Sequence, residues 1–266
     1  MAPDEHYTHG HHESVLRSHT WRTIANSAAY LAPRLTEGCR VLDVGCGPGT
    51  ITAEMADLVG PSGSVTGMDA SAEVVELAAS AHARPNLTFV TGDVYAIDAA
   101  DDTYDVVHAH QVLQHLADPV AALVEMRRVC RPGGVVAARD ADYRGMSWHP
   151  EPPAMDRWLK LYQQVTRRNG GEPDAARLLL TWAHQAGYVD ATASASVWCF
   201  ATPNDRQWWA GLWADRIIQS QLAEQALRDG FATASELVEI ADAWRAWASD
   251  QDAWFAVLHG EILATA

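Results

Sequence analysis

The sequence predicts an α/β fold, in which a doubly wound, mostly parallel sheet of seven strands ends in an antiparallel strand and carries an inserted helical lid. Three observations predict it. Strand and helix patterns alternate over residues 40–140, a glycine-rich turn joins the first strand to the first helix, and an acidic or polar residue follows several strands. Alternating strands and helices form parallel sheets with right-handed crossovers, so the carboxyl ends of the strands share one edge.

The first strand and helix, residues 40–44 and 50–59, enclose the glycine turn. The strand is a short apolar run, typical of a strand buried on both faces, and the helix shows apolar residues at helical spacing. Between them lie Gly45, Gly47 and Gly49. Glycine permits a tight turn and a close approach of ligand to backbone, and the helix N-terminus aims amide donors at the turn.

The second strand, residues 64–69, ends in Asp69, which follows Gly49 by 20 residues. A carboxylate at this distance can accept hydrogen bonds from both hydroxyls of a ribose, so the pattern predicts a ligand that contains adenosine. The dinucleotide fingerprint would need a glycine at position 50, which is Thr50. This departure argues against a nicotinamide cofactor.

The core continues with a helix at 71–83, strands at 87–92 and 104–110, a helix at 118–129 and a strand at 134–140. Ser71 and Asp118 are predicted N-caps. Ligands of such sheets bind outside the carboxyl ends of the strands. One crevice should therefore gather the polar residues at those ends, which are Asp43, Asp69, Asp93, His110 and Asp140.

The C-terminal part adds a loop at 141–153, helices at 154–169 and 173–186, and strands at 189–201 and 255–265. Residues 204–250 are too long for a hairpin turn. They show apolar residues every four positions at Trp209, Trp213 and Ile217, and a capping box that begins at Thr233. We expect two amphipathic helices here, whose tryptophans pack in a core and can also wall a pocket.

The N-terminal segment, residues 1–38, is predicted to hold a helix over 13–34 after a histidine-rich start. The early histidines, which are His6, His9, His11 and His12, lack a carboxylate or cysteine partner at ligand spacing. We therefore predict no metal site. The chain then divides into a lid segment at 1–38, a core at 39–203 and 251–266, and a helical insertion, or cap, at 204–250.

The ordered motifs of residues 39–140 resemble those of class I S-adenosylmethionine-dependent methyltransferases, in particular the ubiquinone/menaquinone-biosynthesis type. The matching pieces are 41–50, Gly67-Met-Asp-Ala-Ser71, Val90-Thr-Gly-Asp93, Tyr104-Asp-Val-Val107, 112–119 and Val129-Cys-Arg-Pro-Gly-Gly134. The resemblance implies a Rossmann-like fold with S-adenosyl-L-methionine as cofactor. It does not imply a particular methyl acceptor.

The same resemblance implies the cofactor-binding residues. Gly45, Gly47 and Gly49 would pass the methionine portion, and Asp69 would accept the ribose hydroxyls beside Ala70. Asp93 would accept from the adenine amino group beside Val94, and the backbone around His110 and Gln111 would face the ammonium or methyl group. In the family the segment before the first strand folds over the cofactor, which would make Tyr7, His11 and His12 lid residues. Asp43 is expected to order the loop through amide hydrogen bonds.

A general base is less evident in the sequence. Asp140 and Asp142 lie past a strand end, where they could bind a polar group, deprotonate it, hold a cation or order the loop through an Asx turn. Histidine titrates near neutrality, so His12 or His149 could serve if the lid brings it close. The catalytic candidates are therefore Asp142, His12 and His149, whereas the family resemblance gives His115 a structural role.

Composition limits the partners. The formal net charge is −15, and nucleic-acid binders usually carry a basic patch, so we expect no nucleic-acid partner and no binding to anionic membranes. The four cysteines form no C-x-x-C pair. Without a signal peptide or a spanning stretch, the expected location is cytoplasmic and membrane insertion is not expected. Homodimerisation is left open.

We therefore expect an enzyme that transfers a methyl group to an oxygen, carbon or nitrogen atom of a small molecule. The acceptor could be quinone-like, phenolic or a secondary metabolite. Two alternatives remain at this point. One is a nicotinamide-dependent oxidoreductase, and the other is a cofactor-binding module that transfers no methyl group and acts as an interaction or pericyclic scaffold.

Overall fold

The computed structural model describes residues 20–266, and its sheet has eight strands in the order β3-β2-β1-β4-β5-β8-β6, with β7 also paired to β8. The strands are β1 (Arg40–Val44), β2 (Ser64–Asp69), β3 (Leu87–Thr91), β4 (Tyr104–His110), β5 (Cys130–Ala141), β6 (Ser147–His149), β7 (Ala191–Phe200) and β8 (Trp254–Thr265). The first five are parallel and β8 is antiparallel to its neighbours. The predicted fold class is confirmed.

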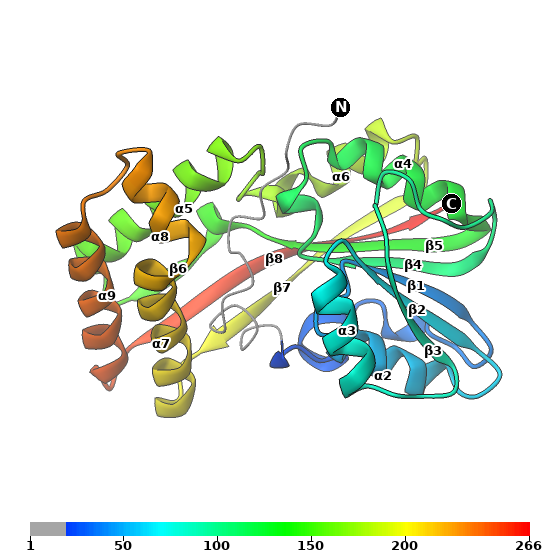
Figure 1. Ribbon diagram of the computed structural model, residues 1–266, viewed down its shortest axis with the longest axis horizontal. Helices are drawn as coiled ribbons and strands as arrows, with labels where there is room; N and C mark the ends of the chain where they lie inside the picture. The colour runs from blue at the N-terminus through cyan, green and yellow to red at the C-terminus, as the bar shows by residue number, and fades with distance from the viewer. Residues whose placement is uncertain (1–19) are drawn as a thin grey trace.

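Helices cover both faces of the parallel strands (Figure 1). They are α2 (Thr50–Val59), α3 (Ala72–Ala81), α4 (Pro119–Val129) and α6 (Leu179–Gln185), with α2 and α3 on one face and α4 and α6 on the other. The predicted N-caps are confirmed, because the Ser71 hydroxyl accepts from the amide of Val74 and the Asp118 carboxylate accepts from that of Ala121.

The eighth strand, β6, lies in residues 141–153, which the sequence predicts to be a loop. It pairs with the start of β8, where Trp148 lies opposite Phe255 and their rings stack with centroids 5.4 Å apart. Three residues among prolines carry too little periodicity to show a strand. These residues form a strand because they pair with β8, which is distant in the sequence, so the local pattern cannot show the pairing.

The predicted helix at 13–34 is wrong over residues 21–34, and its first part lies outside the described residues. Two short helical turns occur instead, Ile24–Ala28 and Ala32–Arg34. Thr23 is extended and caps the first turn, while Trp21 packs against Trp198 at a ring distance of 5.2 Å. Because tertiary contacts fix Trp21, the segment does not continue as one helix.

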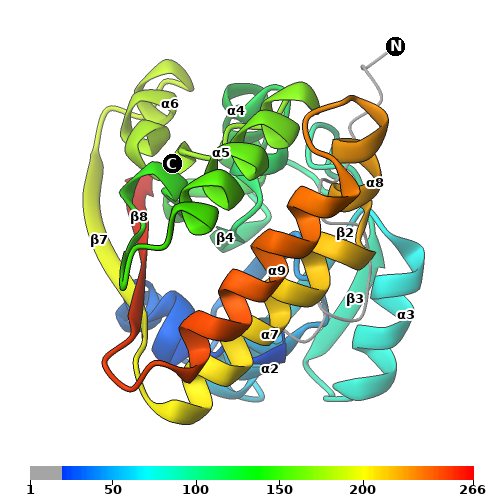
Figure 2. The ribbon, with the colours of Figure 1, turned by 90° about the vertical axis from the view of Figure 1, so that its left-hand side faces the viewer.

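The two long strands β7 and β8 reach beyond the sheet into a second, helical layer (Figures 1 and 2). This layer holds α5 (Pro153–Arg168), α7 (Pro203–Gln219), α8 (Gln221–Arg228) and α9 (Ala234–Ser249). Residues 204–250 thus supply three helices where the sequence predicts two. The extra boundary is at Ser220, which is extended and whose hydroxyl accepts from the amide of Leu222 to start α8.

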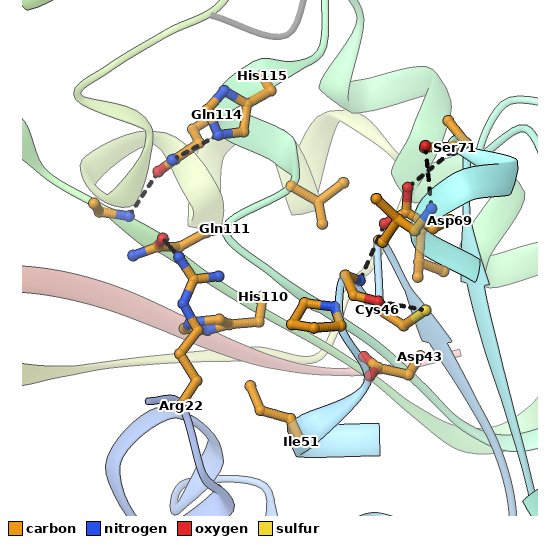
Figure 3. Close-up of a pocket in the computed structure, with 18 of the residues that line it drawn as sticks. Arg22, Asp43, Cys46, Ile51, Asp69, Ser71, His110, Gln111, Gln114 and His115 are labelled. Atoms are coloured by element: carbon orange, nitrogen blue, oxygen red, sulfur yellow. Dashed lines mark hydrogen bonds between the residues drawn. The ribbon is translucent and has the colours of Figure 1, made fainter. Parts of the chain in front are cut away.

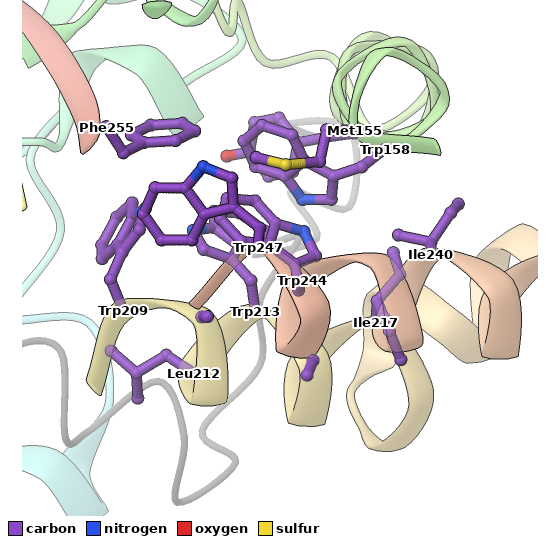
Figure 4. Close-up of a cluster of buried hydrophobic side chains, with 14 of the residues drawn as sticks. Met155, Trp158, Trp209, Leu212, Trp213, Ile217, Ile240, Trp244, Trp247 and Phe255 are labelled. Atoms are coloured by element: carbon purple, nitrogen blue, oxygen red, sulfur yellow. The ribbon is translucent and has the colours of Figure 1, made fainter. Parts of the chain in front are cut away.

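Tryptophans join the helical layer to the sheet (Figure 4). Trp158 of α5 lies 4.5 Å from Trp213 of α7 and 4.9 Å from Trp244 of α9, measured between ring centroids. Phe255 of β8 closes the cluster, and all four side chains are buried. The predicted apolar faces of α7 and α9 are confirmed as core, and they share that core with α5 and β8. In residues 20–266, no helix combines the length and the apolar character that a membrane crossing requires.

Candidate functional site

A cavity of about 750 Å³ lies at the carboxyl ends of the parallel strands, between the glycine turn and the helical layer. One side is formed by the ends of β1, β2 and β3 and by the turn that starts α2. The other side is formed by aromatic and basic side chains, which are Trp21, Arg22, Trp198, Trp208, Trp209, Trp213 and Arg216. The cavity therefore has a strand side and an aromatic side.

The glycine turn is built from backbone that other residues rarely adopt. Gly45, Gly47 and Gly49 have φ angles of 65°, 54° and 80°. A Cβ atom added at Gly49 would lie 2.7 Å from the Phe89 ring, and one at Gly45 would collide with Val112. The angles favour glycine at all three positions, and the packing also requires it at Gly45 and Gly49. Gly45 and Gly47 line the cavity with bare backbone, as binding an extended ligand at close range requires, whereas Gly49 is not among the lining residues.

Asp69 lies at the end of β2 on the strand side of the cavity (Figure 3). Its two carboxylate oxygens accept from the amides of Gly47 and Ser71, each at 3.0 Å. A carboxylate oxygen can accept a second hydrogen bond. The carboxylate is thus fixed in place and keeps acceptor capacity for ribose hydroxyls, which fits the adenosine portion of the expected cofactor.

Asp93 lines the cavity one strand further out, together with Ala70 and Val94. The Asp93 carboxylate accepts from the amide of Tyr95 at 2.9 Å, which fixes the turn after β3. Two small or branched apolar side chains beside a fixed acceptor suit an adenine ring with its amino group. Eight of the residues predicted to bind the cofactor line the cavity. They are Gly45, Gly47, Asp69, Ala70, Asp93, Val94, His110 and Gln111.

Gln111 follows β4 with a φ of 55°, a left-handed backbone at a non-glycine residue. Its amide oxygen accepts from Arg22 Nη2 at 2.6 Å (Figure 3). Its Nε2 lies 2.9 Å from His259 Nε2. Its backbone amide donates to the Arg139 carbonyl at 2.7 Å. Strain of this kind persists where the surroundings fix the residue, and it concentrates at functional sites.

His110 lies on the cavity wall at the end of β4 and is 5% exposed. Within residues 20–266, neither ring nitrogen has a hydrogen-bond partner. Burial, and then the nearby Arg22 guanidinium, hold the pKa of His110 well below its usual value. The ring is therefore neutral near pH 7, with one nitrogen that can donate and one that can accept.

Asp43 fixes the backbone below the glycine turn, but its hydrogen-bond partners differ from those expected. Its carboxylate accepts from the Thr52 hydroxyl at 2.6 Å and lies 2.7 Å from Nδ1 of the buried His108. The expected amide hydrogen bonds are replaced by these side-chain contacts, and the residue still lines the cavity. Its contacts tie β1 to α2 and β4 below the glycine turn.

The catalytic candidates do not converge on the cavity. Both carboxylate oxygens of Asp142 bind Arg177, at 2.9 and 2.7 Å, and one of them also accepts from the amide of Gly145. His149 is exposed, because alternation in β6 turns Trp148 inward. Neither Asp142 nor His149 is among the residues that line the cavity. Tyr7, His11 and His12 lie outside the described residues.

Two basic residues of the aromatic side escaped the sequence reasoning. Arg22 lies in a segment predicted to be an ordinary helix, and Arg216 lies within the apolar face of α7, where it is buried and its guanidinium carbon is 4.7 Å from the centre of the Trp213 ring. The sequence signal that could have identified Arg216 is a charged residue at a position of α7 where the apolar periodicity predicts burial. His115 also lines the cavity, and burial lowers its pKa to about 3.

Comparison with known proteins identifies the activity. The family model described as a methyltransferase domain matches residues 35–205. An uncharacterized methyltransferase of Schizosaccharomyces pombe is 35% identical over 97% of this chain and 95% of that protein. A protein of Aspergillus luteorubrus named "Probable methyltransferase ltbC" is 28% identical over 97% of this chain and 96% of that protein. These matches overturn the nicotinamide alternative.

Other matches cover about half of this chain or show the fold alone. A demethylmenaquinone methyltransferase of Staphylococcus aureus is 33% identical over 47% of this chain and 50% of that protein. A phosphoethanolamine N-methyltransferase of Haemonchus contortus, solved with S-adenosylhomocysteine, shares the fold with a TM-score of 0.57 at 14% identity, over 96% of this chain and 58% of that one. The glycine turn, the fixed Asp69 and these matches lead to one conclusion: the chain belongs to the S-adenosylmethionine-dependent methyltransferases.

Proposed function

We propose that this enzyme methylates an oxygen, carbon or nitrogen atom of a small organic acceptor that binds on the aromatic side of the cavity. The observation that carries the proposal is the continuity of the cavity, which runs from Asp69 on the strand side to Trp213 on the helical layer. A volume of about 750 Å³ lies within the usual range for small-molecule sites. The strand side thus offers polar groups for the cofactor, and the aromatic side offers apolar rings for the acceptor.

On the strand side we propose the cofactor arrangement that the sequence predicts. Gly45, Gly47 and Gly49 would pass the methionine portion, Asp69 would hold the ribose and Asp93 the adenine amino group. When bound, the cofactor supplies an electrophilic methyl group on a positively charged sulfur. The residues of the chain orient it and keep water away from the reacting atoms.

On the aromatic side, Trp198, Trp208, Trp209 and Trp213 offer flat apolar surfaces. Such walls favour aromatic or polyunsaturated acceptors, and offset or edge contacts between rings add to the burial of area. The half-chain similarity to a demethylmenaquinone methyltransferase supports a quinone-like or phenolic acceptor. We also propose that residues 204–250, together with α5, act as the cap over this side, and that residues 1–38 form the remaining cover.

The net charge of −15 supports a partner that is a small molecule and not a nucleic acid. The experiment that tests the function is a screen of quinones, phenols and amines with the full chain and cofactor carrying a labelled methyl group. Asp57→Asn, on the exposed face of α2, provides a matched control for the variant Asp69→Asn. Transfer that depends on Asp69 supports the proposal, whereas cofactor binding without transfer to any class would favour the scaffold alternative.

A further inference from the structure

The charges that line the cavity are segregated. Within residues 20–266 the lining carboxylates are Asp43, Asp69 and Asp93. Asp43 and Asp69 lie at the ends of β1 and β2, and Asp93 follows β3 by two residues. The aromatic side carries Arg22 and Arg216. An acceptor in this part of the cavity therefore meets guanidinium groups and tryptophan rings, in a chain whose overall charge is strongly negative.

Arg22 is held in a defined position next to the strand ends. Its Nη2 donates to the Gln111 amide oxygen at 2.6 Å, and its guanidinium carbon lies 5.8 Å from the centre of the Trp198 ring. His259 Nδ1 lies 3.1 Å from the Val257 carbonyl, which can only accept, so this nitrogen carries the hydrogen and His259 Nε2 accepts from Gln111 Nε2. This network fixes the Gln111 amide with its oxygen toward Arg22, which makes Gln111 a positioning residue.

His110 adds a second polar group at the same place. Its ring lies 5.9 Å from Trp198 and 6.4 Å from His259, centroid to centroid, and it faces the cavity with no hydrogen-bond partner among the described residues. A buried polar group without a partner is rare and calls for a ligand or another explanation. The neutral imidazole can donate one hydrogen bond to an oxygen atom bound beside Arg22.

We propose that the acceptor is an aromatic small molecule with an acidic oxygen, as in a phenol, an enol or a carboxylic acid, and that Arg22 and His110 hold this oxygen as the oxyanion. This inference rests on the proposed function and narrows its acceptor class. A cation nearby favours the ionised form of an acid and repels an ammonium group. Burial by itself disfavours any charge here, so it is the Arg22 guanidinium that favours an anion in front of His110.

The proposal also accounts for the lack of a carboxylate among the residues that line the aromatic side within the described chain. The acceptor loses its proton to water before it binds. Its oxygen then forms a bond to the methyl carbon as the carbon–sulfur bond breaks, the electron pair of that bond goes to sulfur, and the products are a neutral methyl ether or ester and a neutral thioether. No residue has to take up a proton during the transfer.

Calorimetric titration of the full chain, saturated with S-adenosylhomocysteine, tests the inference with three probes of one shape: 2-naphthoate, 2-naphthamide and 2-naphthylmethylammonium. We expect 2-naphthoate to bind about tenfold or more tightly than the other two, the scale of a hydrogen bond to a charged group. In Arg22→Gln this preference should fall to about twofold. His110→Phe keeps a flat ring but removes the nitrogens, and it should weaken 2-naphthoate more than 2-naphthamide.

Arg245→Gln, which removes a guanidinium from the exposed part of α9, is the charge-matched control and should keep the full preference. Equal or tighter binding of the amide or the ammonium probe would overturn the proposal, as would an unchanged preference in Arg22→Gln or no binding of 2-naphthoate at millimolar concentration. The titration of S-adenosylhomocysteine and the labelled-methyl screen are separate readouts. They show whether the proposed function survives when the anion preference fails.

Discussion

The carboxylate of Asp69 accepts a hydrogen bond from the backbone amide of Gly47 at 3.0 Å, across 22 residues of sequence. This contact ties the end of β2 to the glycine turn that follows β1. The residue proposed to hold the ribose therefore also holds the loop proposed to pass the methionine portion. One side chain links the two ends of the cofactor site, and changing it should affect both.

Asp69→Ala should weaken the binding of S-adenosylhomocysteine by about 1.5–3 kcal/mol, the scale of hydrogen bonds to a charged group. The fold should survive, because Asp69 lies at a strand end and is not part of the apolar core. Calorimetry measures the affinity and circular dichroism the fold. Asp69→Asn keeps one acceptor oxygen and should lose less, and an unchanged affinity in the alanine variant would exclude the ribose assignment.

Comparing Gly49→Ala with Gly230→Ala separates the cost of backbone strain, which both variants have, from the cost of a steric clash, which only Gly49→Ala has. Both glycines have positive φ angles, 80° and 69°, but an added Cβ meets the Phe89 ring at 2.7 Å only at position 49, and nothing within 4 Å at position 230. Gly230→Ala should cost about 1 kcal/mol of stability. Urea denaturation should show a larger loss for Gly49→Ala, together with weaker cofactor binding, and equal losses would contradict the packing described.

The tryptophans of the helical layer differ in their exposure to the cavity. Trp213 and Trp244 are both buried and their rings stack at 6.2 Å, but only Trp213 lines the cavity. Replacing either by phenylalanine should cost about 1–3 kcal/mol of stability. Only Trp213→Phe should also change the ranking of acceptors in the methyl-transfer screen. A change of ranking in Trp244→Phe and not in Trp213→Phe would place the acceptor elsewhere.

Asp140 predicts a pH dependence of stability. Burial raises the pKa of Asp140 to about 7, and one of its carboxylate oxygens has no hydrogen-bond partner among the described residues. An unfolded aspartate ionises near pH 3.9, so between about pH 4 and 7 the folded chain binds the extra proton and loses stability as the pH rises, by at most about 1.4 kcal/mol per pH unit.

Asp140→Asn removes this ionisation. Relative to the variant, the parent chain should lose about 1–3 kcal/mol between pH 5 and 7.5 in urea denaturation. Asp242→Asn, on the surface of α9 with a side chain that is 66% exposed, should follow the parent chain at both pH values. Parallel curves for the parent and Asp140→Asn would mean that this carboxyl group is ionised throughout.

The strand side of the site was accessible to sequence reasoning because local patterns encode it. Gly49 with its positive φ, Asp69 at the strand end and Ser71 as an N-cap each follow from residue type and spacing over a few positions. Backbone strain, capping and strand alternation are short-range effects. The structure places these residues where their spacing predicts.

The aromatic side depends on contacts between distant segments, which local patterns do not carry. Arg22 reaches Gln111 across 89 residues, and Gln111 reaches His259 across 148. The sequence pattern could not show that Asp142 would pair with Arg177 or that β6 would turn His149 outward. Deletion of residues 204–250 is a poor test of the cap for the same reason, since it would strip Trp158 of its partners in α7 and α9.

The most direct test of the central claim is a crystal structure of the full chain with S-adenosylhomocysteine. We expect the ribose hydroxyls within hydrogen-bond distance of the Asp69 carboxylate, the homocysteine along the glycine turn, and the sulfur directed toward His110 and the aromatic side. A ligand whose ribose lies among Trp209, Trp213 and Arg216, with the glycine turn untouched, would contradict the division of the cavity into a cofactor side and an acceptor side.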